Sequence, residues 1–246
     1  YGGNAPHYPY IVTDSSTANE VGDEPLLMFR RTGVKLVIGP DRVAAAKQLV
    51  DLGCDIIIAD DGLQHYRLAR DYEIIVIDGK RKFGNQLLLP SGPLREPVSR
   101  INSVDCVVVN GQLNGKIAKP FQQMTLVAQR VTNLASAESL PLSDFLSRHA
   151  DVNAIAGIGD PERFFQTLRD HQFRLARTKG FVDHQAYTED TFGEFASSKP
   201  LLMTEKDAVK CLSFAKAHWW YLTIDASFEN DSQALLIQDI LKLIRK

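Results

Sequence analysis

The sequence predicts an α/β fold with two lobes, and three observations lead to this prediction. Short apolar runs rich in Val and Ile recur along the chain, with little alternation between apolar and polar residues. This pattern is typical of parallel strands that are covered on both faces. A helical pattern lies between the first two runs, which is the order of a βαβ unit. The pattern of predicted strands and helices stops near residue 111 and resumes at Asp151, so we expect a second lobe to begin there.

The predicted strands of the first half span residues 35–38, 55–59, 73–77 and 105–109. A helix is predicted after Pro40, because Asp41 is a suitable N-cap and Gly53 is a suitable stop. A partly alternating stretch over residues 125–131 favours a strand that links the two lobes.

The second half begins with a predicted strand over residues 152–156 and a turn that ends at Pro161. Pro161 fits the first position of a helix, and the apolar residues Phe164, Phe165 and Leu168 follow on one helical face. Two more strands are predicted over residues 200–203 and 219–224, and a last helix over 232–244. We expect a first lobe over residues 1–115, a linker region over 116–150 and a second lobe over 151–246.

Composition is ordinary for a globular protein. The 246 residues carry a net charge of −2, which gives no electrostatic argument for nucleic-acid binding. The cysteines Cys54, Cys106 and Cys211 lie far apart in or beside apolar runs, and we interpret them as buried free thiols. No apolar run approaches the roughly 20 residues that cross a bilayer.

The strongest chemical motif is Asp60-Asp61-Gly62, which follows the predicted strand over residues 55–59. Ligands of open α/β sheets bind at the carboxyl ends of strands, and a carboxylate there can hold Mg²⁺ while phosphates complete its shell. The alternative is a turn that closes the strand, because Asp-Asp-Gly is also a turn signal. Gln64 and His65 come directly after the turn and favour the functional interpretation.

A second acidic pair, Asp23 and Glu24, lies between Gly22 and Pro25 in a predicted loop. A kinase uses a fixed carboxylate to accept a proton from the attacking hydroxyl. The alternative is an exposed acidic turn.

A third motif is the basic, Gly- and Pro-rich stretch over residues 80–97, which includes Arg95. Such a loop can bind anionic groups, or it is simply a solvated basic loop.

In the second half, Asp183-His184 can share a proton, although a lone His is more often structural. At a strand end, Thr204 is a candidate helix cap, and the alternative function there is a contact of Lys206 with a phosphate. The chain contains no Gly-x-x-x-x-Gly-Lys-(Ser or Thr) sequence, which is the phosphate-binding loop of P-loop enzymes.

Taken together, these motifs resemble the tetraacyldisaccharide 4'-kinase (lipid A 4'-kinase) family, in the same order from Tyr1 to about residue 226. Each motif alone is modest, but the ordered set is specific. The motifs that carry the resemblance are Tyr1-Gly2-Gly3, Val21-Gly22-Asp23-Glu24-Pro25, residues 33–42, Asp60-Asp61-Gly62-Leu63-Gln64-His65, Leu68-Ala69-Arg70-Asp71, Asp78-Gly79, Phe83-Gly84-Asn85, residues 88–97, residues 156–165, Asp183-His184 and residues 204–208.

The resemblance implies a P-loop-kinase-like parallel sheet lobe, incomplete at its N-terminus, and a smaller second α/β lobe joined to it by a β-strand linker. It implies transfer of the γ-phosphate of ATP to the 4'-hydroxyl of a tetraacylated glucosamine disaccharide 1-phosphate, with Mg²⁺, at the cytoplasmic face of the inner membrane of Gram-negative bacteria. The partners it implies are ATP, the acylated disaccharide phosphate lipid and, by peripheral contact, the membrane, but no nucleic acid.

The resemblance also implies residue roles. Asp23 would be the catalytic base, and His184 would pair with it. Asp60 and Asp61 would serve Mg²⁺. The residues that would contact substrate or phosphate are Glu24, Gln64, His65, Arg95 and Lys206.

Family members carry a membrane-associating helix and the phosphate-binding loop before the Tyr1-Gly2-Gly3 position. Since the chain begins with Tyr1 and contains no such loop, we expect it to be N-terminally truncated and to have little or no kinase activity as given. Two rival functions are a metal-dependent phosphatase that uses Asp60 and Asp61, and a non-catalytic or vestigial lobe that binds acylated sugar. The phosphatase is disfavoured because dehalogenase-type sites need Asp-x-Asp, and Ile58 and Gly62 flank Asp60 at that spacing.

Overall fold

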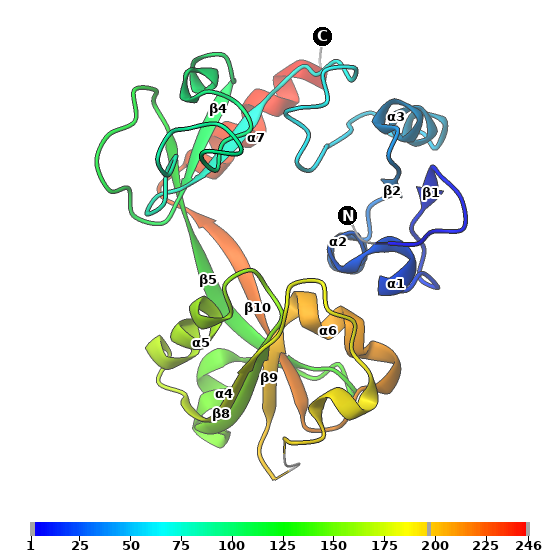
Figure 1. Ribbon diagram of the computed structural model, residues 1–246, viewed down its shortest axis with the longest axis vertical. Helices are drawn as coiled ribbons and strands as arrows, with labels where there is room; N and C mark the ends of the chain where they lie inside the picture. Colours follow the sequence, from blue (N-terminus) through cyan, green and yellow to red (C-terminus); the bar gives the residue numbers. More distant parts are fainter. Residues whose placement is uncertain (1–2, 196–197, 245–246) are drawn as a thin grey trace. The chain divides into compact units, whose positions relative to one another are not determined.

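The computed structural model describes residues 3–195 and 198–244, and its chain forms two compact units (Figure 1). Unit 1 comprises Tyr1–Cys54 and Ala128–Ile224, and unit 2 comprises Asp55–Val127 and Asp225–Lys246. Strands β5 (Gln122–Asn133) and β10 (Trp219–Phe228) have residues in both units. The division into lobes over residues 1–115 and 151–246, with a linker over 116–150, stays a prediction.

The sheet of unit 1 has the strand order β5-β10-β9-β7-β8, and the contacts β10–β9, β9–β7 and β7–β8 are all parallel. A short strand, β6, pairs antiparallel with β5. The bounds are β6 Ser139–Pro141, β7 Asp151–Ala156, β8 Arg174–Gly180 and β9 Leu201–Thr204. The parallel arrangement confirms the α/β class that the apolar runs predicted.

Helices cover both faces of this sheet, which explains the continuous apolar runs. Leu202 on β9 packs in a cluster with Phe145 of α4 (Leu142–Arg148) and Leu168 of α5 (Pro161–Asp170). The next residue, Met203, points to the opposite face and packs with Cys211 of α6 (Glu205–Cys211). Successive strand residues therefore enter two different cores.

The N-terminal part of unit 1 packs on α6. It consists of β1 (Tyr10–Ile11), α1 (Ala18–Val21), α2 (Asp23–Thr32), β2 (Val37–Ile38) and α3 (Arg42–Asp51). Val209 of α6 lies in one buried cluster with Val12, Val21 and Leu26. This contact fixes the first turn of α2 against the first turn of α6, and both turns carry charged residues.

Unit 2 contains β3 (Ile74–Asp78), which pairs parallel with β4 (Cys106–Asn110), and β4 pairs parallel with the start of β5. The unit also contains α7 (Ser232–Ile244). All of Cys106–Val109 is buried, as the apolar run predicted. On β3, however, Ile77 is buried whereas Val76 is 58% exposed, so the prediction that both faces are covered is wrong for this strand.

Several local predictions are confirmed. The side chain of Asp41 accepts hydrogen bonds from the N–H groups of Val43 and Ala44, so it caps α3. Gly53 has a φ of +80° just after that helix ends, a conformation that L side chains rarely adopt. Pro161 is the first residue of α5. The predicted helix over residues 232–244 has the bounds of α7, and the stretch over 125–131 lies within β5.

Three further predictions are wrong. Residues 55–59 form no strand, and Ile58 is 91% exposed. A strand needs a neighbouring backbone to hydrogen-bond with, and no strand of the described ranges pairs with these residues. The βαβ unit fails with it, because its second strand does not form, and β2 pairs antiparallel with β1 instead. The acidic pair predicted to lie in a loop is instead the start of α2. Pro25 is compatible with this helix because N–H groups of the first turn have no intrahelical acceptor.

The three cysteines are thiols, and Cys106 and Cys211 are buried whereas Cys54 is half-buried. Burial raises the pKa of Cys211 to about 12.

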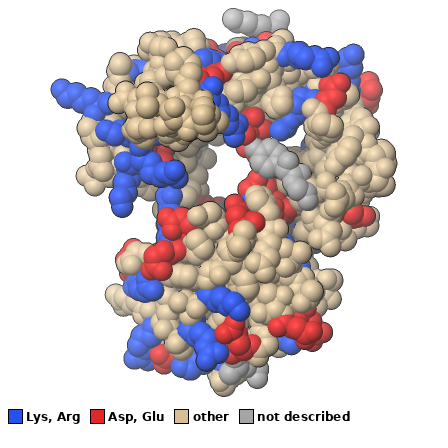
Figure 2. All heavy atoms as spheres, in the orientation of Figure 1, with Lys and Arg blue, Asp and Glu red and all other residues tan. Residues whose placement is uncertain are grey.

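Figure 2 shows Lys and Arg side chains interspersed with Asp and Glu side chains on the visible face of unit 1. Within residues 3–195 and 198–244, no helix combines the length and the apolar character that spanning a membrane requires.

Candidate active site

Asp23 is the first residue of α2, and its side chain is buried although it is polar. Gly22 precedes it with a φ of +88°, which turns the chain sharply between α1 and α2. Asp23 is 6% exposed, and its Oδ1 atom accepts a hydrogen bond of 3.0 Å from the N–H group of Glu24. A carboxylate at this position is stabilised by the positive end of the helix dipole.

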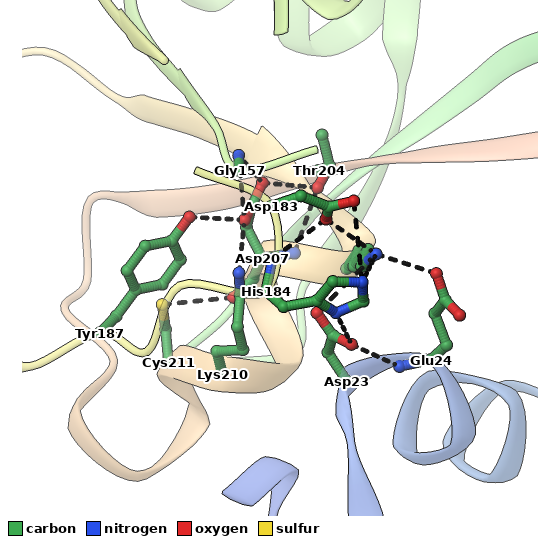
Figure 3. A network of polar contacts seen from close by, with 11 residues as sticks. Asp23, Glu24, Gly157, Asp183, His184, Tyr187, Thr204, Asp207, Lys210 and Cys211 are labelled. Atoms are coloured by element: carbon green, nitrogen blue, oxygen red, sulfur yellow. Dashed lines mark hydrogen bonds and ion pairs between the residues drawn. The ribbon is translucent and has the colours of Figure 1, made fainter. Parts of the chain in front are cut away.

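His184 meets Asp23 from a distant part of the chain. Its Nδ1 atom lies 3.0 Å from the Oδ1 atom of Asp23 (Figure 3). The His184 backbone has a φ of +59°, an uncommon conformation for a residue other than Gly, and its N–H group donates to Oδ1 of Asp183. The structure therefore brings together the two residues for which the sequence predicted a joint catalytic role, while that role itself stays a prediction.

Lys206 lies in the first turn of α6 beside this pair. Its Nζ atom donates to Oε1 of Glu24 at 2.8 Å and to Oδ1 of Asp183 at 3.0 Å. Burial opposes its charge, but these two hydrogen bonds outweigh burial and raise the pKa of Lys206. Conversely, burial favours a higher pKa of Asp183, and the hydrogen bond from Lys206 reverses this and lowers it. Both groups are therefore charged at neutral pH.

Asp207, the next residue, is fully buried and joins three segments of the chain. Its carboxylate accepts hydrogen bonds from the N–H group of Gly157 at 3.0 Å and from the hydroxyl of Tyr187 at 2.7 Å. It also accepts one from the hydroxyl of Thr204 at 2.6 Å and forms an ion pair of 3.0 Å with Lys210. Thr204 accepts from the N–H group of Asp207, so its predicted capping role is confirmed.

A cavity of about 500 Å³ in unit 1 borders the Asp23–His184 pair. It is lined by residues of three segments, including Thr17, Asp23, Arg30 and His184. This volume lies within the range of pockets that take small ligands, about 300–1,000 Å³. A hydroxyl-bearing ligand in this cavity would come close to Asp23.

The other predicted site residues lie in unit 2. Asp60 and Asp61 are exposed and occupy a turn. Nη1 of Arg95 donates to both carboxylate oxygens of Asp61, at 2.9 and 2.7 Å, and to Oε1 of Gln64 at 3.2 Å. The structure thus brings together Asp61, Gln64 and Arg95, whereas His65 is exposed nearby in sequence. Across the described part of the chain, no group of three or more His, Cys, Asp or Glu side chains could hold a metal ion.

Sequence reasoning missed several residues around the Asp23–His184 pair. Asp183 was noted only as the neighbour of His184, and Asp207, Tyr187 and Lys210 were given no role. Spacing offered one signal, because Thr204 and Asp207 stand three residues apart at a helix start, where side chains reach backbone groups. Nothing local connects Tyr187 with Asp207, since their contact depends on packing between segments.

Comparison with known proteins agrees with this picture. The family model described as LpxK, tetraacyldisaccharide-1-P 4'-kinase, matches residues 1–242. The tetraacyldisaccharide 4'-kinase of Colwellia psychrerythraea (strain 34H) is 52% identical over 240 residues, which cover 96% of this chain and 70% of that protein. The tetraacyldisaccharide 4'-kinase of Histophilus somni (strain 2336) is 45% identical over 247 residues, 100% of this chain and 73% of that protein.

A solved structure is also similar. It is the crystal structure of the "apo" form of LpxK from Aquifex aeolicus in complex with ATP, with a TM-score of 0.77 and 26% sequence identity. The match covers 96% of this chain and 74% of that one. It supports the expected P-loop-kinase-like α/β fold. The family match over nearly the whole chain and the close relatives give one conclusion: this chain belongs to the tetraacyldisaccharide-1-P 4'-kinase family.

Proposed function

We propose that the protein transfers the γ-phosphate of ATP to the 4'-hydroxyl of a tetraacyl glucosamine disaccharide 1-phosphate. The observation that carries this proposal is the Asp23–His184 pair, a buried carboxylate held by an imidazole at the edge of a cavity. Family membership supplies the reaction class, and the geometry supplies a base for the acceptor hydroxyl.

Asp23 is suited to accept the hydroxyl proton. Its Oδ1 atom receives Glu24 N–H and faces His184 Nδ1. Its Oδ2 atom receives no hydrogen bond from the residues that the structure describes. In the proposed step, the hydroxyl oxygen forms a bond to the γ-phosphorus while the bond from that phosphorus to the bridging oxygen breaks. The hydroxyl proton passes to Asp23, and ADP leaves with the electron pair.

We propose that Asp60 and Asp61 serve Mg²⁺. Carboxylate oxygens suit this ion, which proteins usually hold through one or two carboxylates together with substrate phosphates, and two adjacent exposed aspartates fit that description. When bound, the ion would neutralise charge that develops on the phosphates. The guanidinium of Arg95 holds the carboxylate of Asp61 in place.

Further residues are proposed to contact the substrates. Glu24, Gln64, His65 and Arg95 are candidates to contact substrate or phosphate, and Arg95 presents a guanidinium that suits phosphate oxygens. Since the acyl chains of such a substrate stay in a bilayer, we propose that the protein works in peripheral contact with the cytoplasmic face of the inner membrane. Co-sedimentation with anionic phospholipid vesicles tests this, and recovery of all protein in the supernatant would contradict it.

We also propose that a polypeptide of only these 246 residues transfers little or no phosphate. It contains no Gly-x-x-x-x-Gly-Lys-(Ser or Thr) sequence to hold the β- and γ-phosphates through backbone N–H groups. Turnover by the purified polypeptide that matches the product of the complete reading frame would refute this.

The test of the function uses the protein expressed from its complete reading frame. It is incubated with ATP labelled at the γ-phosphate and with tetraacyldisaccharide 1-phosphate in detergent micelles. We expect label in the lipid, its loss in Asp23→Asn and its retention in Asp170→Asn, an exposed carboxylate at the end of α5. Lipid binding without transfer would favour a binding role, and phosphate release from phosphosugars without ATP would favour a phosphatase.

A further inference from the structure

The ammonium of Lys206 touches a neighbour of each member of the Asp23–His184 pair. Glu24, which follows Asp23, accepts from Nζ at 2.8 Å, and Asp183, which precedes His184, accepts at 3.0 Å. The same Nζ atom lies 3.5 Å from Nε2 of His184 and 3.9 Å from Oδ2 of Asp23. Figure 3 shows the Asp23, Glu24, Asp183 and His184 side chains close together.

A lysine ammonium has three N–H donors. Two point to Glu24 and Asp183, and the nearest further acceptor is Nε2 of His184. The Lys206 side chain is only 14% exposed. A phosphate contact, the role that the sequence suggested for Lys206, would have to displace one of these interactions.

The segment that carries His184 is a loop, and its residues Phe181 and Tyr187 pack in the core of unit 1. Residues 181–188 contain no helix or strand, and His184 has a positive φ. Side chains of α6 hold the segment on both sides of His184. Lys206 donates to Asp183, Asp207 accepts from the hydroxyl of Tyr187, and the ammonium of Lys210 lies 4.1 Å from the centre of the Tyr187 ring. Lys206 also reaches α2, through Glu24. It is therefore the side chain that joins both halves of the pair.

We propose that Lys206 is a positioning residue. It keeps the side chains of Asp23 and His184 oriented toward each other and does not bind the phosphates of ATP. This inference rests on the proposed function, since it assigns a role in the same reaction. Its basis is the placement of one ammonium between the two acidic neighbours of the pair.

The charge of Lys206 acts on the pair as well. Its ammonium lies 3.9 Å from Oδ2 of Asp23 and attracts that carboxylate. It also lies 3.5 Å from Nε2 of His184, to which it can donate when Nδ1–H donates to Asp23, and Oδ2 of Asp183 lies 3.7 Å from the same Nε2 atom. Glu24 and Asp183, the other charged groups of this cluster, are themselves held by Lys206.

The first experiment measures steady-state kinetics of Lys206→Met in the protein from the complete reading frame. We expect kcat to fall by about 10- to 100-fold, because small displacements of a catalytic group have effects of this size, while the KM for ATP changes by less than about 2-fold. Lys206→Arg, which keeps the charge and the N–H donors, should recover much of the lost kcat.

A control is Lys242→Met, which removes an exposed ammonium that donates to Asp239 at the same 2.8 Å, and which should leave kcat and the KM for ATP unchanged. A rise in the KM for ATP with an unchanged kcat would overturn the inference and restore the phosphate contact. If the unsubstituted protein transfers no phosphate to the lipid, the proposed function fails instead, so the two failures are distinguishable.

A double-mutant cycle covers the case in which Lys206→Met folds poorly. Glu24→Gln and Asp183→Asn nearly keep the shape of the side chain, and each weakens one hydrogen bond with Lys206. If Lys206 acts through the pair, each variant should lose most of its effect on kcat in a His184→Ala background. Fully additive effects would contradict the proposal.

Discussion

The Nδ1 atom of His184 lies 3.0 Å from the Oδ1 atom of Asp23, although 161 positions separate the two residues in the sequence. Helix α2 brings the carboxylate, and the segment after β8 brings the imidazole. Asp23 is 6% exposed whereas the His184 side chain is 44% exposed, so the contact is sheltered from water on the side of the carboxylate. A hydrogen bond is stronger in such a partly buried place than in water.

Asp23→Asn tests the base directly. The amide keeps the shape but cannot accept a proton, so kcat for phosphate transfer should fall by about 100- to 10,000-fold, while the KM values for ATP and lipid change little. His184→Ala should lower kcat as well, and the double variant should be little worse than Asp23→Asn alone because the two residues act as a unit. Kinetics of the three variants check this, and multiplicative losses would show independent roles.

Asp207→Ala should destabilise unit 1 by about 3–5 kcal/mol. The substitution removes the partner of the buried Lys210 ammonium and leaves several hydrogen-bond donors without an acceptor. Urea unfolding followed by tryptophan fluorescence reports on this unit, since both tryptophans of the chain, Trp219 and Trp220, lie in its cores. The matched control is Asp151→Ala, which breaks an exposed pair with Arg174 and should leave the urea midpoint nearly unchanged. Equal midpoints for both variants would contradict the buried network.

Tyr187 should make stability fall at alkaline pH. Burial, reinforced by the neighbouring Asp207 carboxylate, raises the pKa of Tyr187 above the ordinary value of about 10. Above that pH the unfolded chain releases the phenolic proton while the folded protein keeps it, so unfolding becomes easier as pH rises. The contribution is complete below about pH 10 and is lost above it.

Melting temperatures between about pH 9 and about pH 11 check this expectation. Tyr187→Phe should lose less stability over this interval than the unsubstituted protein. Tyr8→Phe, whose exposed hydroxyl donates to Gly3, should follow the unsubstituted protein. Parallel curves for all three proteins would show that Tyr187 is not linked to folding.

Asp41→Ala should loosen the start of α3, since Asp41 accepts from two N–H groups of its first turn. Loss of such a cap costs about 0.5–2 kcal/mol. Amide hydrogen exchange of Arg42–Asp51 measures the effect locally. Asp51→Ala at the other end of the helix should slow exchange slightly or leave it unchanged, because a carboxylate there opposes the helix dipole. Faster exchange in both variants would argue against a specific cap.

The strand predicted over residues 55–59 shows where sequence reasoning fails. Its run of three isoleucines has a strong strand propensity, yet Ile58 is 91% exposed and unpaired in any described sheet. Propensity describes one segment, whereas a strand requires a hydrogen-bonded neighbour. The acidic pair at the start of α2 was misplaced for a different reason, since Pro25 indicated a loop but is also tolerated in a first helical turn.

The sequence by itself determined the α/β class, the cap of α3, the start of α5 and the span of α7. Each of these depends on residues within a few positions of one another, where backbone geometry and side-chain periodicity act directly. It also named Asp23, His184 and Lys206 as candidates. Only the tertiary structure decided that Lys206 lies between Glu24 and Asp183, and that Asp207 holds Tyr187 and Gly157. Such contacts join distant segments, and it is the packing of α2 and the 181–188 segment against α6 that creates them.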